Sequence, residues 1–172
     1  ILHYRSIDLV DWSYKGLLFN AQTSPQLKMW ECPNFFKLMD RHVLLVSLFP
    51  NIQGVYYYVG HFDGQVFMPV SEGYLEKGTA FYAPHVRQFT DGRAILFAWL
   101  LEGRSDAALE AAGWAGVQSL PRELAVDEFD RLISKPAREL ITLRQQETEF
   151  EYIWLDPDEK IKIPFEGKRL EI

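Results

Sequence analysis

The 172-residue sequence lacks the features that mark several large classes of protein. It has one cysteine, Cys32, so an internal disulfide is impossible. No apolar run approaches the roughly 20 residues that span a membrane. With 18 Lys and Arg against 24 Asp and Glu, the net charge is −6, and the chain lacks the basic surface that nucleic acids and anionic membranes attract. The histidines form no cluster at metal-ligand spacing, so neither a metal nor another cofactor is expected.

Aromatic residues are plentiful instead, at 15% of the chain beside a hydrophobic fraction of 48%. Two interpretations stay open at this point. Aromatic side chains are favoured in β-sheets, which alone accounts for the excess. Their faces also stack on sugars and other flat apolar surfaces.

Short apolar or alternating runs separated by turn residues predict an all-β fold. Several runs are rich in Val, Ile, Tyr and Phe. Asp63-Gly64 and Asp91-Gly92 are hairpin-type turns, because glycine adopts positive φ without strain. Many short strands at near-regular spacing favour a sandwich, a barrel or a propeller. The predicted strands are Leu2–Ser6, Phe35–Met39, Val43–Phe49, Val55–His61, Ala94–Leu101, Val117–Leu120, Glu123–Val126 and Arg131–Ser134.

Two segments are predicted to be helical. Ser105–Ala112 is rich in alanine and is either a short helix or a single helical turn within a loop. Ala137–Gln146 follows Pro136, which suits the first turn of a helix. Three later runs predict the opening of a second β domain: Phe150–Leu155, Lys160–Ile163 and Arg169–Ile172.

The sharpest local signal is the run Trp30-Glu31-Cys32-Pro33-Asn34-Phe35-Phe36. A carboxyl group beside apolar neighbours loses hydration, which favours its protonated form. A protonated carboxylic acid can donate a proton to a leaving oxygen, and Pro33 would fix the backbone just after the acid. From the residues alone, Glu31 is either such a proton donor or, more commonly, a surface residue in a strand-edge turn.

This run resembles the Glu-Cys-Pro signature of family-32 glycoside hydrolases, which include invertases, sucrose-6-phosphate hydrolases and fructan hydrolases. Other stretches of the chain resemble further signatures of that family, in the same order. Each is weak alone, but together they cover nearly the whole chain and shift Glu31 toward a catalytic role. They are Leu2–Trp12, Tyr57–Asp63, Phe81–Pro84, Gly92–Trp99 and Gly113–Leu124.

The resemblance implies a five-bladed β-propeller followed by a β-sandwich. Residues 1–135 would form the last blades, a partial catalytic domain. Residues 136–148 would form a linking helix, and residues 149–172 the truncated beginning of the sandwich. Ile1-Leu2-His3-Tyr4-Arg5 reads as the middle of a strand, so a removed N-terminal segment is expected.

The implied chemistry is retaining cleavage of β-fructofuranosidic bonds in sucrose, sucrose phosphate or fructans. Such enzymes use one carboxylate as nucleophile and another as general acid/base, and Glu31 matches the second role. The family's nucleophile lies in an Asn-Asp-Pro motif and its transition-state stabiliser in an Arg-Asp-Pro motif, and this sequence contains neither. The chain alone is therefore expected to be an inactive fragment. Its open sheet edges predict a partner, either a missing N-terminal half or another copy.

Sugar-binding candidates follow from the same resemblance. Tyr82 and Trp99 either line the sugar pocket or belong to the blade core. Glu76 stands where the family usually has an Asp that holds the sugar beyond the fructose, and is otherwise a solvated loop residue. Cys32 either tunes the surroundings of Glu31 or fills a small buried space. Trp30 completes the set of candidates.

Two alternatives remain beside hydrolysis. A fructosyltransferase of the same fold would pass the fructosyl group to a sugar instead of to water. A non-catalytic sugar-binding propeller piece would lack both missing motifs even in the longer protein. The sequence leaves the cellular compartment open, with the cytoplasm slightly favoured.

Overall fold

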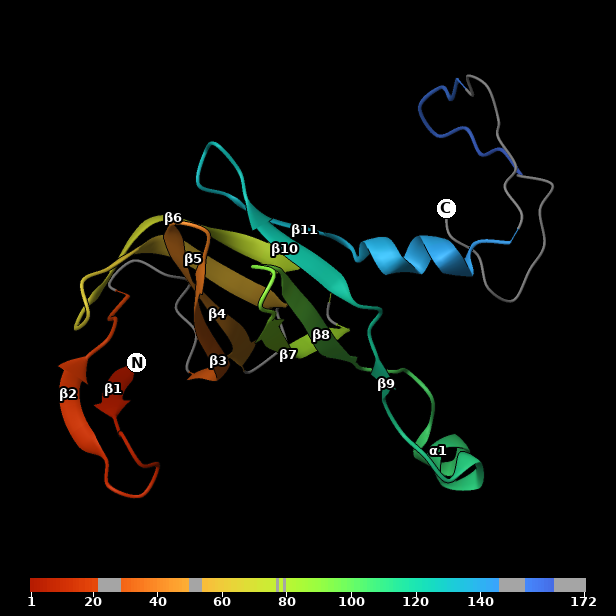
Figure 1. Cartoon of the computed structure of the whole chain (residues 1–172). Coiled ribbons are helices and arrows are strands. Elements are labelled where there is room, and N and C mark those ends of the chain that lie inside the picture. Colours follow the sequence, from red (N-terminus) through yellow and green to blue (C-terminus); the bar gives the residue numbers. More distant parts are fainter. Residues whose placement is uncertain (22–28, 50–53, 77, 79, 146–153, 163–172) are drawn as a thin grey trace. The chain divides into compact units, whose positions relative to one another are not determined.

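The computed structural model describes residues 1–21, 29–49, 54–76, 78, 80–145 and 154–162. The chain divides into two units, Ile1–Leu140 and Ile141–Ile172. The first unit contains a two-stranded, a four-stranded and a five-stranded sheet (Figure 1). Within the described residues, no helix has the length and apolarity needed to cross a membrane.

The four-stranded sheet is an antiparallel meander in the order β3-β4-β5-β6. Its two central strands are buried on both faces, which matches their almost continuous apolar sequences, interrupted in β4 by Ser47. The predicted Asp63-Gly64 turn joins β5 to β6, with the Asp63 carboxylate accepting from the backbone N–H groups of Gln65 and Val66. The strands are β3 (Met29–Leu38), β4 (Arg41–Phe49), β5 (Val55–Phe62) and β6 (Phe67–Glu76).

The five-stranded sheet has the order β11-β10-β8-β7, with the short β9 pairing to β8. The predicted Asp91-Gly92 turn joins β7 to β8. Between β8 and β9 lies α1 (Asp106–Ala112), which is a true helix because Ser105 caps its N-terminus and Gly113 its C-terminus. The strands are β7 (Phe81–Gln88), β8 (Ala94–Leu100), β9 (Val117–Gln118), β10 (Arg122–Val126) and β11 (Leu132–Pro136).

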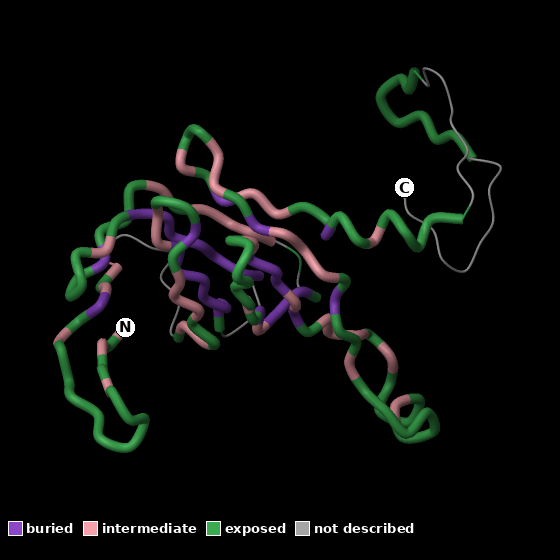
Figure 2. Tube along the Cα trace, viewed as in Figure 1, coloured by how far each residue is buried: buried purple, intermediate pink, exposed green. Residues whose placement is uncertain are grey.

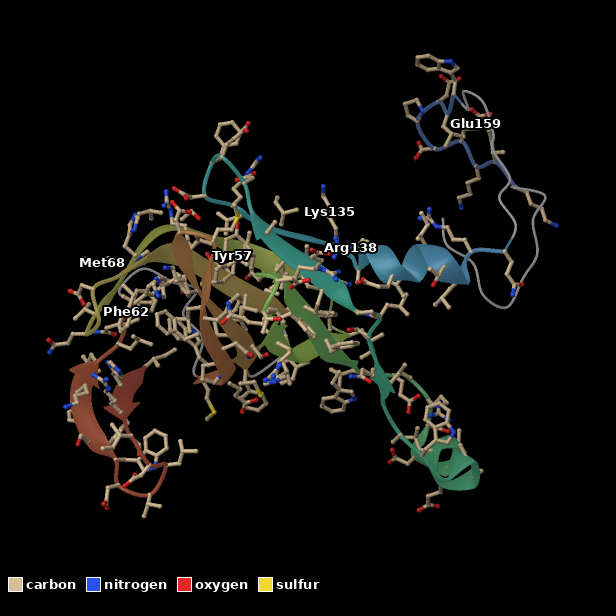
Figure 3. The ribbon with its side chains drawn as sticks, in the orientation of Figure 1. Tyr57, Phe62, Met68, Lys135, Arg138 and Glu159 are labelled. Atoms are coloured by element: carbon tan, nitrogen blue, oxygen red, sulfur yellow. The ribbon has the colours of Figure 1, made fainter. Side chains whose placement is uncertain are left out.

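The main core lies between these two sheets. Buried side chains of β4 and β5, such as Leu45 and Tyr57, pack in one cluster with side chains of β8 and β10, such as Leu96 and Leu124. Figure 2 shows the buried segments concentrated in the larger sheets, and Figure 3 labels Tyr57 among them. At the rim, Arg41 Nε donates to Asp130 Oδ1 at 2.7 Å, which ties β4 to the β10–β11 turn. The sheets are thus joined as neighbouring blades.

A second cluster covers the other face of the four-stranded sheet. It contains Leu44 and Tyr58 of the central strands, with Phe19 packed against it. The hairpin of β1 (Leu2–Arg5) and β2 (Ser13–Leu17) approaches this face, and the chain leaving it is anchored where Phe67 N donates to Leu18 O at 2.8 Å. Phe62, labelled in Figure 3, packs edge-to-face with the His3 ring at a centroid distance of 5.8 Å.

The all-β prediction is confirmed. The strands predicted from the sequence did not include β2, β6 and β7. Pro69 lies in β6 and Pro84 in β7, and proline argues against a strand in a sequence. Both are accommodated beside register shifts, where the ladder is already interrupted.

The helix predicted over 137–146 is shorter, a 3₁₀ helix at Arg138–Leu143 (η1). Of the tail strands predicted after it, the described residues 154–162 form no strand, and the other residues lie outside the described ranges. The β-sandwich therefore stays a prediction.

Candidate active site

Glu31 lies on β3, the strand at one end of the four-stranded sheet. It pairs with Ser47 of β4, whereas Asn34 pairs with Leu45, so one extra residue is inserted in β3 between them. Cys32 within this bulge has a φ of 49°, in the left-handed region that side chains rarely adopt. Pro33 is tolerated next to it because a bulge on an end strand needs no ladder N–H there.

The same device recurs in the next sheet. Tyr82 of β7 pairs with Trp99 of β8, His85 pairs with Phe97, and one extra residue again intervenes. Ala83 has a φ of 47° and is followed by Pro84. Since β3 and β7 are each the end strand of their sheet, Glu31 and Tyr82 occupy equivalent positions in neighbouring sheets. The two bulges therefore have the same backbone shape. In the sequence, this repeat is marked only by the pairs Cys32-Pro33 and Ala83-Pro84.

These equivalent positions bring Glu31 and Tyr82 together. Tyr82 Oη donates to Glu31 Oε2 at 2.5 Å. Tyr82 is only 6% exposed, and burial, followed by the bond to Glu31, raises the pKa of its phenol well above the ordinary value. Tyr82 therefore remains a protonated donor throughout the pH range in which enzymes work, and it holds the partly exposed carboxyl group of Glu31.

Two further polar side chains join the bulges. The Asn34 amide Nδ2 donates to Pro84 O at 2.7 Å and to Cys32 O at 3.0 Å, and its Oδ1 accepts from Val86 N at 3.1 Å. The buried Ser47 hydroxyl accepts from Ala83 N at 3.0 Å. An open pocket of about 510 Å³ lies between the bulges, lined by residues 32–36 and 83–86.

The sequence analysis included Asn34 only as part of the run around Glu31, without a role of its own, and it missed Ser47. The pairs Cys32-Pro33 and Ala83-Pro84 mark the two bulges that Asn34 and Ser47 contact, so they offered a sequence signal for both residues. Recognising it would have required knowing that the two bulges face each other.

Cys32 is exposed, so the interpretation of this residue as a small buried filler is wrong. The bulge is the cause, because its left-handed conformation turns the residue out of the sheet. Its backbone carbonyl, by contrast, is used by Asn34.

The two tryptophans among the sugar-binding candidates, Trp30 and Trp99, have different surroundings. Trp30 packs against Phe19 and Tyr58, at centroid distances of 6.0 and 5.6 Å, in the second hydrophobic cluster. Trp99 pairs with Tyr82 across the strands and is 48% exposed. A Cβ on Gly116 would lie 2.5 Å from Trp99 Nε1, so this glycine allows the close approach of the backbone to the ring.

Glu76 is placed at the end of β6, where its carboxylate pairs with Arg122 at 3.1 Å and accepts from Gly78 N at 3.3 Å. The Arg122 guanidinium lies 4.4 Å from the centre of the Phe81 ring. The ion pair with Arg122 joins β6 to β10 of the other sheet, and neither of these contacts links Glu76 to Glu31. Among the residues that the structure describes, no group of His, Cys, Asp and Glu side chains is arranged to hold a metal ion.

Comparison with known proteins identifies a matching family profile and relatives of this chain. Residues 1–136 match the profile described as the glycosyl hydrolases family 32 N-terminal domain. The chain is 34% identical over 160 residues to sucrose-6-phosphate hydrolase of Escherichia coli, covering 85% of this chain and 32% of that protein. It is 36% identical over 162 residues to sucrose-6-phosphate hydrolase of Vibrio alginolyticus, covering 86% and 33%.

Solved structures show the same fold. The β-fructofuranosidase of Bombyx mori superimposes with a TM-score of 0.69 at 30% identity, over 84% of this chain and 33% of that one. Fructan 1-exohydrolase IIa of Cichorium intybus does so with a TM-score of 0.69 at 28% identity, over 84% and 31%. These neighbours confirm the predicted blades of a five-bladed β-propeller. The chain spans about a third of the length of the relatives it matches.

Proposed function

Because the chain belongs to glycosyl hydrolase family 32, we propose that it forms part of a retaining glycosidase that cleaves β-fructofuranosidic bonds. Glu31 is the general acid/base in this proposal. The observation that supports it is the 2.5 Å hydrogen bond from the buried Tyr82 phenol to Glu31, at the end strands of two adjoining blades. A carboxyl group that is oriented by one donor and still partly exposed is suited to exchange a proton with a bound substrate.

In the first step, protonated Glu31 gives its proton to the glycosidic oxygen while the attacking carboxylate bonds to the anomeric carbon of fructose and the glycosidic bond breaks, which releases the other sugar and leaves a fructosyl ester. Tyr82 stabilises the carboxylate that remains, because its O–H donates to one of the carboxylate oxygens. In the second step, this carboxylate takes a proton from the water that attacks the fructosyl intermediate. The same hydrogen bond keeps Glu31 oriented through both steps.

The attacking carboxylate has no assigned position within these 172 residues, because neither Asn-Asp-Pro nor Arg-Asp-Pro occurs in the sequence. Retaining glycosidases need it roughly 5 Å from the acid/base. Glu76, the other acid in the set of candidates, is paired with Arg122 instead. We therefore assign the nucleophile to the remainder of a longer protein, so that the catalytic pair forms only when the propeller is complete.

The substrate class is a β-fructofuranoside. The relatives named sucrose-6-phosphate hydrolase support sucrose phosphate as the unit recognised, and the Bombyx mori β-fructofuranosidase solved in complex with sucrose supports sucrose itself. Tyr82 and Trp99 would line the sugar site together with exposed Cys32. The packing of Trp30 in the hydrophobic cluster supports an indirect role, as part of the wall behind β3.

Partners and domain limits belong to the same proposal. Residues 1–135 would be blades of the catalytic propeller, residues 136–148 the link, and residues 149–172 the start of a β-sandwich. The exposed apolar side chains of the β1–β2 hairpin, including Leu2, Tyr4 and Leu17, support contact with a missing part of the propeller or with another copy.

The test compares the whole protein that carries this chain with its Glu31→Gln variant. On sucrose, Glu31→Gln should lose roughly 10²- to 10⁴-fold in kcat, because the leaving oxygen needs a proton. On a nitrophenyl β-fructofuranoside the first step should change little, since that leaving group needs none. Azide should then restore turnover, because it attacks the intermediate without a general base.

Glu110→Gln is the matched control, because Glu110 is exposed on α1. It should cleave both substrates at the original rate. The 172-residue chain by itself should release no fructose from sucrose or inulin. Cleavage of sucrose by Glu31→Gln within a few-fold of the original rate would contradict the assignment, and transfer products in place of free fructose would indicate a transferase.

A further inference from the structure

We propose that Glu102 is a positioning residue that holds the indole ring of Trp99 in the sugar site. The inference rests on the proposed function, in which Trp99 lines that site. Glu102 lies just after β8, in the segment 101–116 that contains α1 and leads to β9 (Figure 1). This segment is called the β8–β9 arm below. The carboxylate acts on the ring through the far end of the arm.

The arm begins at the same end of β8 as the candidate acid/base. Trp99 pairs with Tyr82, whose hydroxyl donates to Glu31. Leu101 N donates to Ala80 O at 2.7 Å, which continues the pairing of these strands to the base of the arm. The side chain of Trp99 is 48% exposed, so a bound sugar can reach the ring. Trp99 thus adjoins both the candidate site and the arm.

The ring of Trp99 packs on the far end of the arm. A Cβ on Gly116 would meet Trp99 Nε1 at 2.5 Å and Cδ1 at 3.2 Å, so the indole lies directly against the backbone there. Gly116 has a φ of 77°, in the left-handed region that favours glycine. The ladder between β9 and β8 starts one residue later, where Val117 pairs with Leu100. The sheet therefore holds the chain only beyond Gly116.

Glu102 holds Gly116 itself. Glu102 Oε1 accepts from Gly116 N at 3.0 Å, a bond that joins the two ends of the arm across 14 positions. Arg104 Nε and Nη2 donate to the two oxygens of the same carboxylate, each at 2.7 Å. Arg104 Nη2 also donates to Trp114 O at 3.3 Å, and its guanidinium lies 3.9 Å from the centre of the Trp114 ring. These contacts fix the carboxylate in one orientation toward Gly116.

The rest of the arm gives Gly116 little support. α1 is capped by Ser105 and Gly113 and buries none of its own residues, so packing of the helix contributes little to the placement of the arm. Arg104, followed by the N–H of Gly116, lowers the pKa of Glu102, so the carboxylate stays ionised and remains an acceptor. The position of Gly116, and of the ring packed on it, therefore depends on Glu102.

The experiment measures Glu102→Ala and Glu102→Gln in the whole protein that carries this chain. In Glu102→Ala, KM for sucrose should rise roughly 5- to 20-fold with kcat within about threefold, because a ring that binds the sugar in the ground state and the transition state alike has moved. A merely structural defect would lower kcat through the active fraction and leave KM unchanged. Glu102→Gln keeps an oxygen for Gly116 N and loses the ion pair with Arg104, so its rise should be smaller. It serves if Glu102→Ala does not fold.

Glu110→Ala is the matched control, because it makes the same change at an exposed residue of α1 within the arm. Both its KM and its kcat should equal the original values.

A double-mutant cycle with Trp99→Ala tests whether Glu102 acts through the ring. Trp99→Ala alone should raise KM at least as much as Glu102→Ala does. When Trp99→Ala is already present, adding Glu102→Ala should change KM less than about twofold, because the ring that Glu102 holds is gone. An equal effect of Glu102→Ala with and without the ring would overturn the inference.

Fluorine NMR supplies a readout that is independent of activity. The whole protein labelled with fluorotryptophan should give a resonance from position 99, which is identified by its absence in Trp99→Phe. This resonance should shift in Glu102→Ala, because the surroundings of the indole ring change. It should keep its position in Glu110→Ala.

The outcomes separate this inference from the proposed function. A normal KM in Glu102→Ala, or a resonance that stays in place, overturns the role of Glu102 while Glu31→Gln remains defective on sucrose. Full sucrose cleavage by Glu31→Gln overturns the acid/base assignment, whereas the role of Glu102 is decided by KM and by the cycle with Trp99. A rise in KM that depends on Trp99, together with a shifted resonance, supports the inference.

Discussion

Replacing Tyr82 with phenylalanine removes a single hydroxyl from the candidate site. The ring of Tyr82 stays in the core beside β8, because Phe differs only by the oxygen that donates to Glu31. The variant thus isolates the contribution of one hydrogen bond to the acid/base. It also leaves the ties from Asn34 and Ser47 in place.

The magnitude follows from the kind of bond that is lost. A hydrogen bond to a charged group contributes roughly 1.5 to 3 kcal/mol, and Glu31 is partly exposed, which favours the lower end of that range. Since about 1.4 kcal/mol corresponds to a factor of ten in rate, kcat/KM for sucrose should fall roughly tenfold. The bond stabilises the carboxylate that forms as Glu31 gives up its proton, so its loss raises the barrier to that step.

The assay is kcat/KM for sucrose in the whole protein, measured beside kcat/KM for a nitrophenyl β-fructofuranoside. In Tyr82→Phe, the loss should appear on sucrose and be several-fold smaller on the nitrophenyl substrate, because that leaving group needs no proton. Tyr14→Phe is the control, since Tyr14 is exposed in the β1–β2 hairpin, and both of its rates should match the original.

Two results would refute this reasoning. A kcat/KM for sucrose within about twofold of the original in Tyr82→Phe would show that the bond does not support proton transfer. An equal loss on both substrates would show that the hydroxyl supports the fold of the site and not the acid/base. Either result would leave Glu31→Gln as the independent test of the acid/base assignment.

Two predictions concern stability. Arg93 holds the pKa of Glu139 down to about 2 and lowers that of Glu123, so the stabilisation from this cluster is complete above the ordinary carboxyl value near 4.5 and is lost as pH falls toward 2. The difference in urea midpoint between the original protein and Arg93→Met should therefore shrink over that range, and a constant difference would contradict it. Leu45→Ala, at 0% exposure between the blades, should lower the free energy of unfolding by roughly 2 to 5 kcal/mol in urea titrations. Leu120→Ala, at 66% exposure, should lower the free energy of unfolding by less than about 0.5 kcal/mol. Equal losses in the two variants would contradict the position of Leu45 in the core.

The sequence by itself determined the fold class and the central strands. β4 and β5 could be predicted because strands buried on both faces carry almost continuous apolar runs, and the Asp-Gly turns followed from the freedom of glycine at positive φ. The motif around Glu31 indicated a catalytic acid through its resemblance to a family. These signals are local, so they can be read along one chain.

Only the tertiary structure decided what surrounds Glu31. Tyr82 lies 51 positions away in the sequence, and no local pattern places its hydroxyl at the carboxyl group. The outward position of Cys32 depends on a bulge, which arises when one strand carries an extra residue relative to its partner. The ties from Asn34 and Ser47 exist because two end strands of different sheets face each other. Packing between blades sets these contacts, since periodicity records which face of a strand is buried and not which residues meet across it.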